Sequence, residues 1–148
     1  MTLLQNPYFI VPLIAWAIAQ ASKVIIDSVM LHRLSVRRLA TAGGMPSSHS
    51  ALVVSLTTII GRLQGVGSPL FAVCLIFATV VMYDATGVRR AAGQQAIIIN
   101  RLLDDLFIAH RGIHQERLRE LLGHTPIEVI AGALLGVVIG RASCRERV

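Results

Sequence analysis

Long stretches without a charged residue constrain the fold of this chain more than any other feature. No Asp, Glu, Lys or Arg occurs in residues 1–22 or in residues 63–83. A helix needs roughly 20 mainly apolar residues to cross a bilayer, so both stretches are long enough. Two further apolar segments, residues 51–60 and 129–140, are shorter. With 54% hydrophobic residues and a mean hydropathy of +0.67, a soluble domain of 148 residues is disfavoured.

The pattern predicts an all-α integral membrane bundle with about four spanning helices and one or two amphipathic helices at the interface. The expected spanning helices cover residues 7–28, 48–63 and 70–84, the last extending toward residue 90. A fourth is expected to begin at Thr125, where Pro126 takes the first helical position and Glu128 the third, a typical helix start. The expected amphipathic helices cover residues 91–109 and 114–122.

A single domain is expected over residues 1–141. Residues 142–148 look foreign to it, because they end an apolar helix abruptly with charged residues. No Lys or Arg precedes Lys23, which favours a retained first helix over a signal peptide.

The basic character of the chain points to an anionic partner. The net charge is +6, and it arises from 13 Arg and one Lys that lie mainly in two segments between the helices. Aromatic residues make up only 5% of the chain, so there is little to stack on bases, and nucleic acid is disfavoured. Anionic lipid or phosphate is the expected partner. The two cysteines give no disulfide framework, and without a Cys/His cluster we expect neither a metal nor another cofactor.

The segment GGMPSSHS at residues 43–50 stands directly before an apolar run. Ser47 or Ser48 can cap the helix that follows, and the free N–H groups of its first turn attract anions such as phosphate. His49 adds a group that can move a proton near neutral pH. The alternative is that His49 only hydrogen-bonds a loop carbonyl.

Other polar residues are expected at the same membrane face. If four helices alternate in direction, Lys23, His49, Arg89 with Arg90, and His124 all lie at helix ends on one side. Lys23 is either a phosphate ligand or the helical partner of Asp27. The two arginines either bind phosphate bidentately or anchor the third helix, and Asp84 is a candidate to orient one of them.

The segment around His124 offers a nucleophile. Glu128 lies one helical turn after His124 and could hold one nitrogen of its ring. The alternative is that the Glu128 carboxylate is taken up by the capping box that begins at Thr125. In the same helix, Gly132, Gly136 and Gly140 form a ridge of small residues that serves either contact within the chain or a homodimer.

Taken together, these segments resemble the type 2 phosphatidic acid phosphatase and vanadium haloperoxidase superfamily, in its divergent branch of small membrane proteins. PSSH at residues 46–49 is similar to the Pro-Ser-Gly-His of the second signature motif of the superfamily. Residues 123–128, with His124 and Glu128, resemble the end of the third, and YDATGVRRAAG at residues 83–93 completes the pattern of the branch. The resemblance covers about residues 6–140.

The resemblance implies a phosphatase that needs no metal and acts on a lipid or another amphiphilic phosphate. His124 would form a phosphohistidine, Glu128 would orient His124, and His49 would protonate the leaving oxygen. The phosphate oxygens would be held by Ser47, Ser48, Lys23 and Arg89 or Arg90. The chain departs from the superfamily in three ways: no Arg-Pro follows Lys23, Leu118 stands where an Arg precedes the third-motif His, and Glu128 replaces Asp. The alternative function is a non-catalytic membrane module that binds anionic lipid or phosphate.

The chain is expected in the cell (inner) membrane. Apart from the candidate site residues, seven arginines fall on the side of the motifs and only Arg62 falls in the opposite loop. The positive-inside rule therefore predicts that the motif-bearing face is cytoplasmic. The resemblance favours the outer face, where many members of the superfamily work.

Overall fold

The computed structural model describes residues 2–31, 44–107 and 123–143. Within these ranges the regular structure is entirely helical: η1 (Leu3–Gln5), α1 (Pro7–Leu31), α2 (Ser48–Leu63), α3 (Pro69–Thr86), α4 (Val88–Phe107) and α5 (Pro126–Ala142). The all-α fold class is therefore confirmed. The helix expected at residues 114–122 and residues 144–148 of the tail lie outside the described residues.

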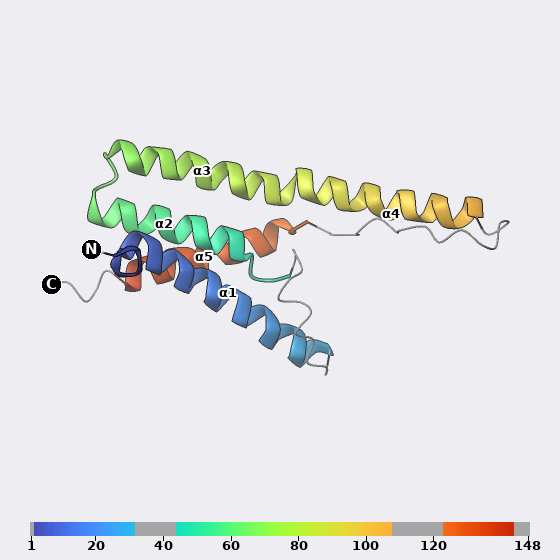
Figure 1. Ribbon diagram of the computed structural model, residues 1–148, viewed down its shortest axis with the longest axis horizontal. Coiled ribbons are helices and arrows are strands. Elements are labelled where there is room, and N and C mark those ends of the chain that lie inside the picture. The colour runs from blue at the N-terminus through green and yellow to red at the C-terminus, as the bar shows by residue number, and fades with distance from the viewer. Residues whose placement is uncertain (1, 32–43, 108–122, 144–148) are drawn as a thin grey trace.

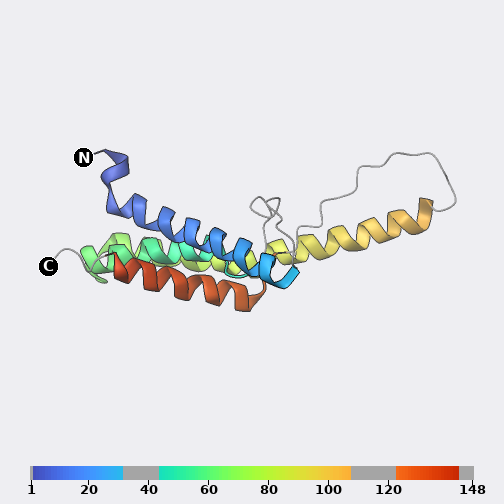
Figure 2. The ribbon, with the colours of Figure 1, turned by 90° about the horizontal axis from the view of Figure 1, so that it is seen from below.

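Four helices form a bundle with α2 at its centre. α2 packs against α1, α3 and α5, and consecutive helices of the bundle run in opposite directions (Figures 1 and 2). The ends of α1 and α3 and the starts of α2 and α5 consequently meet at one end of the bundle. The α2–α3 turn, the start of α1 and the end of α5 lie at the other end. This alternation places the sequence motifs at the same end, as expected.

α4 continues almost directly from α3 instead of lying across the bundle. Only Gly87 separates the two helices, and its N–H still donates to the Tyr83 carbonyl. α4 therefore extends along the line of α3 and projects beyond the other helices (Figure 1). The amphipathic helix expected at residues 91–109 begins three residues earlier, at Val88. Gly87 is the one residue that interrupts the helical run between α3 and α4.

Among the described residues, two segments are long and apolar enough to cross a membrane: Pro7–Ile26 of α1, and Pro69–Leu103, which includes α3. α2 and α5 have 16 and 17 residues, fewer than the roughly 20 that a spanning helix usually has. Four spans therefore stay a prediction. The outer faces of the bundle carry large exposed apolar side chains, a surface that suits lipid better than water: Trp16, Ile25, Val73, Ile76, Phe77, Ile130, Leu134 and Val138.

Small residues let the helices approach closely at the core. Ala15 and Ala19 of α1 and Ala51 of α2 are fully buried together. On α1 the buried residues Val11, Ala15 and Ala19 recur at four-residue spacing, and Lys23 is the next position of the same stripe. The stripe that packs α1 on the bundle therefore also carries Lys23 inward.

The glycine ridge of α5 packs against α2. A Cβ at Gly136 would lie 2.7 Å from the Ala51 carbonyl oxygen, and one at Gly140 would lie 2.7 Å from Cβ of Thr58. A Cβ at Gly132 would overlap the carbonyl oxygen of Ser47. The ridge thus serves contact within the chain, one of its two expected uses. A homodimer through this face stays a prediction and would require α2 to move away.

We expect Gly132→Ala to destabilise the protein, because the added methyl group meets backbone that cannot rotate away. Overpacking of this kind costs about 1–3 kcal/mol of unfolding free energy. Thermal unfolding in detergent, followed by circular dichroism, measures the effect. Gly67→Ala is the matched control, since a Cβ there meets nothing within 4 Å. Equal melting temperatures for the two variants would contradict this packing.

Candidate functional site

The start of α2 is capped by Ser47. Its Oγ accepts hydrogen bonds from the Ser50 N–H at 3.4 Å and from the Ser50 hydroxyl at 3.1 Å. Ser47 is fully buried, so its hydroxyl is committed to the helix start. Ser47 is therefore the cap, and the hydroxyl of Ser48, the other candidate, can bind another partner.

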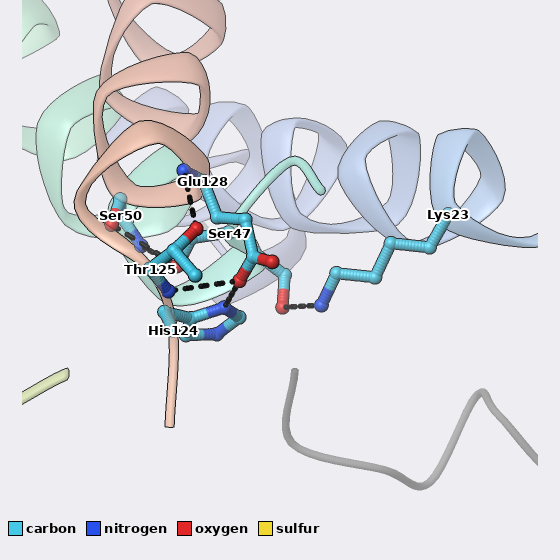
Figure 3. A network of polar contacts seen from close by, with 7 residues as sticks. Lys23, Ser47, Ser50, His124, Thr125 and Glu128 are labelled. Carbon is cyan, nitrogen blue, oxygen red and sulfur yellow. Dashed lines mark hydrogen bonds and ion pairs between the residues drawn. The ribbon is translucent and has the colours of Figure 1, made fainter. Parts of the chain in front are cut away.

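That partner is Lys23. Its Nζ donates to Ser48 Oγ at 3.2 Å, although the two residues lie on different helices (Figure 3). Lys23 is only 6% exposed, and its aliphatic stem passes Gly44, whose φ of +88° suits glycine. The ammonium thus lies beside the first turn of α2, where helix N–H groups already favour negative charge. The side chain of Asp27, the alternative partner, lies outside the described residues.

Glu128 bonds both the helix start and the histidine. One carboxylate oxygen, Oε2, accepts from the Thr125 N–H at 3.2 Å and contacts His124 Nδ1 at 3.0 Å (Figure 3). The Thr125 hydroxyl in turn accepts from the Glu128 N–H at 3.4 Å, which completes the capping box. An ionised carboxylate only accepts, so Nδ1 carries the proton of this contact. The two roles expected as alternatives for Glu128 are therefore combined in one oxygen.

The other ring nitrogen of His124 is available for chemistry. His124 is 3% exposed, and its Nε2 has no hydrogen-bond partner within the described ranges. The backbone of His124 is fixed as well, because its N–H donates to the Ala85 carbonyl at 3.1 Å. In the neutral tautomer with the proton on Nδ1, which faces Glu128, the buried Nε2 has a free lone pair.

His49 lies next to His124. The centroids of the two imidazole rings are 6.1 Å apart, and the ring planes meet at 65°. His49 is exposed in the first turn of α2 and also lines a cavity of about 200 Å³. In the described part of the chain, the other lining residues come from the last turns of α3: Val80, Val81, Asp84 and Ala85.

Seven of the candidate residues are thus brought together at one end of the bundle. Lys23, Ser47, Ser48, His49, Asp84, His124 and Glu128 gather there through the contacts given above. Arg90 is exposed in the first turn of α4, and the side chain of Arg89 lies outside the described residues. The structure places Asp84 in the cavity beside His49, a position that the sequence did not indicate.

Sequence reasoning missed three backbone features of this site. The Ala85 carbonyl holds His124, the Ser47 N–H donates to the Glu128 carbonyl at 2.9 Å, and Gly132 lies against Ser47. Backbone carbonyls leave no mark in a sequence, so the first two could not be read. Gly132 did stand out as part of the glycine ridge, but its partner segment could not be inferred.

These features define a helical bundle that has, at one end, a buried histidine paired with a half-buried carboxylate and a buried lysine. A family model described as "Divergent PAP2 family" matches residues 4–139, and the chain belongs to this family. It is 44% identical over 149 residues to the "Uncharacterized membrane protein YuiD" of Bacillus subtilis (strain 168), with 94% of each chain covered. No solved structure matches the chain. The resemblance to a divergent phosphatidic acid phosphatase branch is therefore confirmed.

We expect Glu128 to fix the tautomer of His124. In the wild-type protein the proton should reside on Nδ1, and in Glu128→Ala it should shift toward Nε2, because the hydrogen bond at one nitrogen decides the state of the other. Imidazole nitrogen chemical shifts report the tautomer, with the His124 signal assigned by its loss in His124→Asn. Thr125→Ala is the control, since it weakens the cap and keeps the carboxylate. An unprotonated Nε2 in Glu128→Ala would contradict this role.

Proposed function

We propose that this protein is a membrane phosphatase that hydrolyses a lipid or another amphiphilic phosphate through a phosphohistidine on His124, without a metal ion. The observation that carries the proposal is the state of His124. Its Nδ1 is held by the Glu128 carboxylate, while its Nε2 is buried and has no hydrogen-bond partner in the described ranges. A nucleophile held by an acceptor on its far side is the arrangement that covalent catalysis requires.

The first step would transfer the phosphoryl group to the protein. His124 Nε2 forms a bond to phosphorus while the bond from phosphorus to the leaving oxygen breaks. His49 gives its proton to that oxygen, so the alcohol leaves uncharged. The ring separation of 6.1 Å supports this division of roles, because a phosphoryl group must fit between the nucleophile and the acid.

The second step would return the protein to its starting state. Water attacks the phosphorus of the phosphohistidine, His49 takes a proton from that water, and the bond between nitrogen and phosphorus breaks. Inorganic phosphate leaves. The same imidazole therefore acts as acid and then as base.

The charge on the transferred phosphate needs fixed partners, which are the main catalytic device in phosphoryl transfer. The Lys23 ammonium and the first turn of α2 lie at the same end of the bundle as His124. Lys23 donates a hydrogen bond to Ser48 Oγ in that turn. Arg89 or Arg90 would add a guanidinium from the start of α4. The site lies at the end of an apolar bundle, which suits a phosphate head group joined to a chain in the bilayer.

We expect His124→Ala to abolish release of phosphate from dodecyl phosphate or phosphatidic acid, because the covalent route is lost. His49→Asn should slow release about 10²–10⁴-fold, the usual loss for a general acid. Purified protein in a phosphate-free detergent, with colorimetric detection of phosphate, measures both. Arg62→Gln, at the opposite end of the bundle, is the control.

A radiolabelled substrate tests the intermediate directly. Rapid quenching should leave label on the wild-type protein and none on His124→Ala. Wild-type rates in His124→Ala would overturn the nucleophile. A protein that binds dodecyl phosphate and never hydrolyses it would favour the alternative, a non-catalytic module that binds anionic lipid or phosphate.

We also propose that the chain lies in the cell (inner) membrane with the site on the cytoplasmic face. The excess of arginine on the motif-bearing side supports this orientation. We expect a cysteine at position 67 (Gly67→Cys) to react with a membrane-impermeant thiol reagent in intact cells. Arg37→Cys should react only after permeabilisation. Both variants are made in a background without Cys74 and Cys144, and the reverse labelling pattern would show the opposite orientation.

A further inference from the structure

α3 and α4 together are longer than a membrane is thick. The apolar segment Pro69–Leu103 has 35 residues, which as one helix is about 52 Å long at a rise of 1.5 Å per residue. The hydrocarbon core of a bilayer is about 30 Å thick, and a helix tilted by as much as about 40° would still extend about 40 Å along the membrane normal. α3 alone, with 18 residues, is about 27 Å long. Most of α4 therefore lies beyond the hydrocarbon core.

α4 nevertheless exposes large apolar side chains along one side. Val88, Ile98, Ile99 and Leu102 are between 43% and 63% exposed. With 3.6 residues per turn, these four positions fall within an arc of about 100°, and we call it the apolar arc. A helix of a soluble protein turns such an arc toward its own core. Here the apolar arc faces outward, so it needs an apolar partner outside the bundle.

The apolar arc continues the outer, lipid-suited side of α3. Val73, Phe77 and Val80 of α3 follow one another at three- and four-residue spacing, as neighbours on one face of a helix do. The same spacing, counted onward through residues 84, 91, 95 and 98, leads to Val88 and Leu102 of α4. All five of these apolar side chains are more than half exposed. This continuity points to lipid as the partner of α4 as well.

The charge and the breadth of the exposed face also favour a membrane surface. Arg90 and Arg101 are exposed and lie about 120° from the centre of the apolar arc by the same helical period. A helix at a membrane surface buries its apolar side, while its arginines reach the head groups. The apolar arc includes the adjacent residues Ile98 and Ile99, so it is broader than the narrow seam of a coiled coil with a second copy.

We propose that α4 turns at Gly87 and lies along the membrane surface, with the apolar arc at the boundary between the head groups and the acyl chains. Gly87 is the one residue between the two helices, and its φ of −99° and ψ of −86° are not helical. α3 ends where the candidate site lies, so α4 would begin at the head-group level beside that site (Figure 1). The proposal concerns the membrane contact of α4 and goes beyond the proposed function.

Spin labels on single cysteines measure the depth of α4 in a bilayer. Val88→Cys and Leu102→Cys are made in the full chain without Cys74 and Cys144, and are placed in phosphatidylcholine–phosphatidylglycerol nanodiscs. Accessibility to oxygen and to a water-soluble nickel chelate reports the depth of each label. The two labels are about 21 Å apart along the helix. Both should lie at the same shallow depth, whereas an α4 in line with α3 would carry the Leu102 label about 21 Å farther out than the Val88 label.

Matched variants calibrate the measurement. Phe77→Cys of α3 is the reference for lipid, and Gly67→Cys of the α2–α3 turn is the reference for water. Arg101→Cys lies next to Leu102 on the polar side of α4, so it should stay accessible to the nickel chelate. Ile98→Cys is a second label in the apolar arc, to be used if thermal unfolding shows that Leu102→Cys does not fold.

Three outcomes would overturn the proposal. Labels at Leu102 and Ile98 that are as accessible to the nickel chelate as the Gly67 label would show that the apolar arc does not contact lipid. An Arg101 label as deep as the Phe77 label would show that α4 crosses the membrane. Strong dipolar broadening between Leu102 labels in nanodiscs that hold two copies would show that a second copy covers the apolar arc. None of these measurements depends on phosphate hydrolysis, so the failure of the proposed function is a separate result.

Discussion

The docking of the first turn of α5 onto the start of α2 is the contact on which the rest of the site depends. The Ser47 N–H donates to the Glu128 carbonyl at 2.9 Å. Gly132 has no side chain, so the backbones of the two segments can come into contact. This contact joins two segments far apart in the sequence and brings His124 to His49. Because the two backbones touch at Gly132, any side chain at this position would push α5 away from α2.

The carboxylate of Glu128 links helix formation to side-chain orientation. Its Oε2 accepts from the Thr125 N–H, which starts α5, and it also holds Nδ1 of His124. The direction of the imidazole is therefore set by the same carboxylate oxygen that caps the helix, and the Ala85 carbonyl fixes the backbone of His124. A histidine held at one ring nitrogen and at its backbone loses little freedom when a ligand binds, which is the advantage of a preorganised site.

The polar groups are confined to one end of an otherwise apolar bundle. Charged side chains are costly within lipid and are retained there in pairs or at interfaces. Lys23 follows this rule, since it is buried at the inner end of the α1 stripe and donates to Ser48. The ammonium of Lys23 therefore adds its positive charge to the first turn of α2, where the helix N–H groups already favour an anion.

The sequence by itself determined the helices and the end of the bundle at which the motifs lie. Charge-free stretches specify apolar helices, and the segments before Ser48 and Pro126 specify where α2 and α5 begin. Because the helices alternate in direction, the motifs then fall at one end of the bundle. Family membership followed from the same motifs. Only the tertiary structure decided which serine caps α2, that one oxygen of Glu128 serves both Thr125 and His124, and that Asp84 lies in the cavity beside His49. These outcomes depend on distances of about 3 Å between individual atoms and on how the helices pack, and sequence patterns carry no information on that scale.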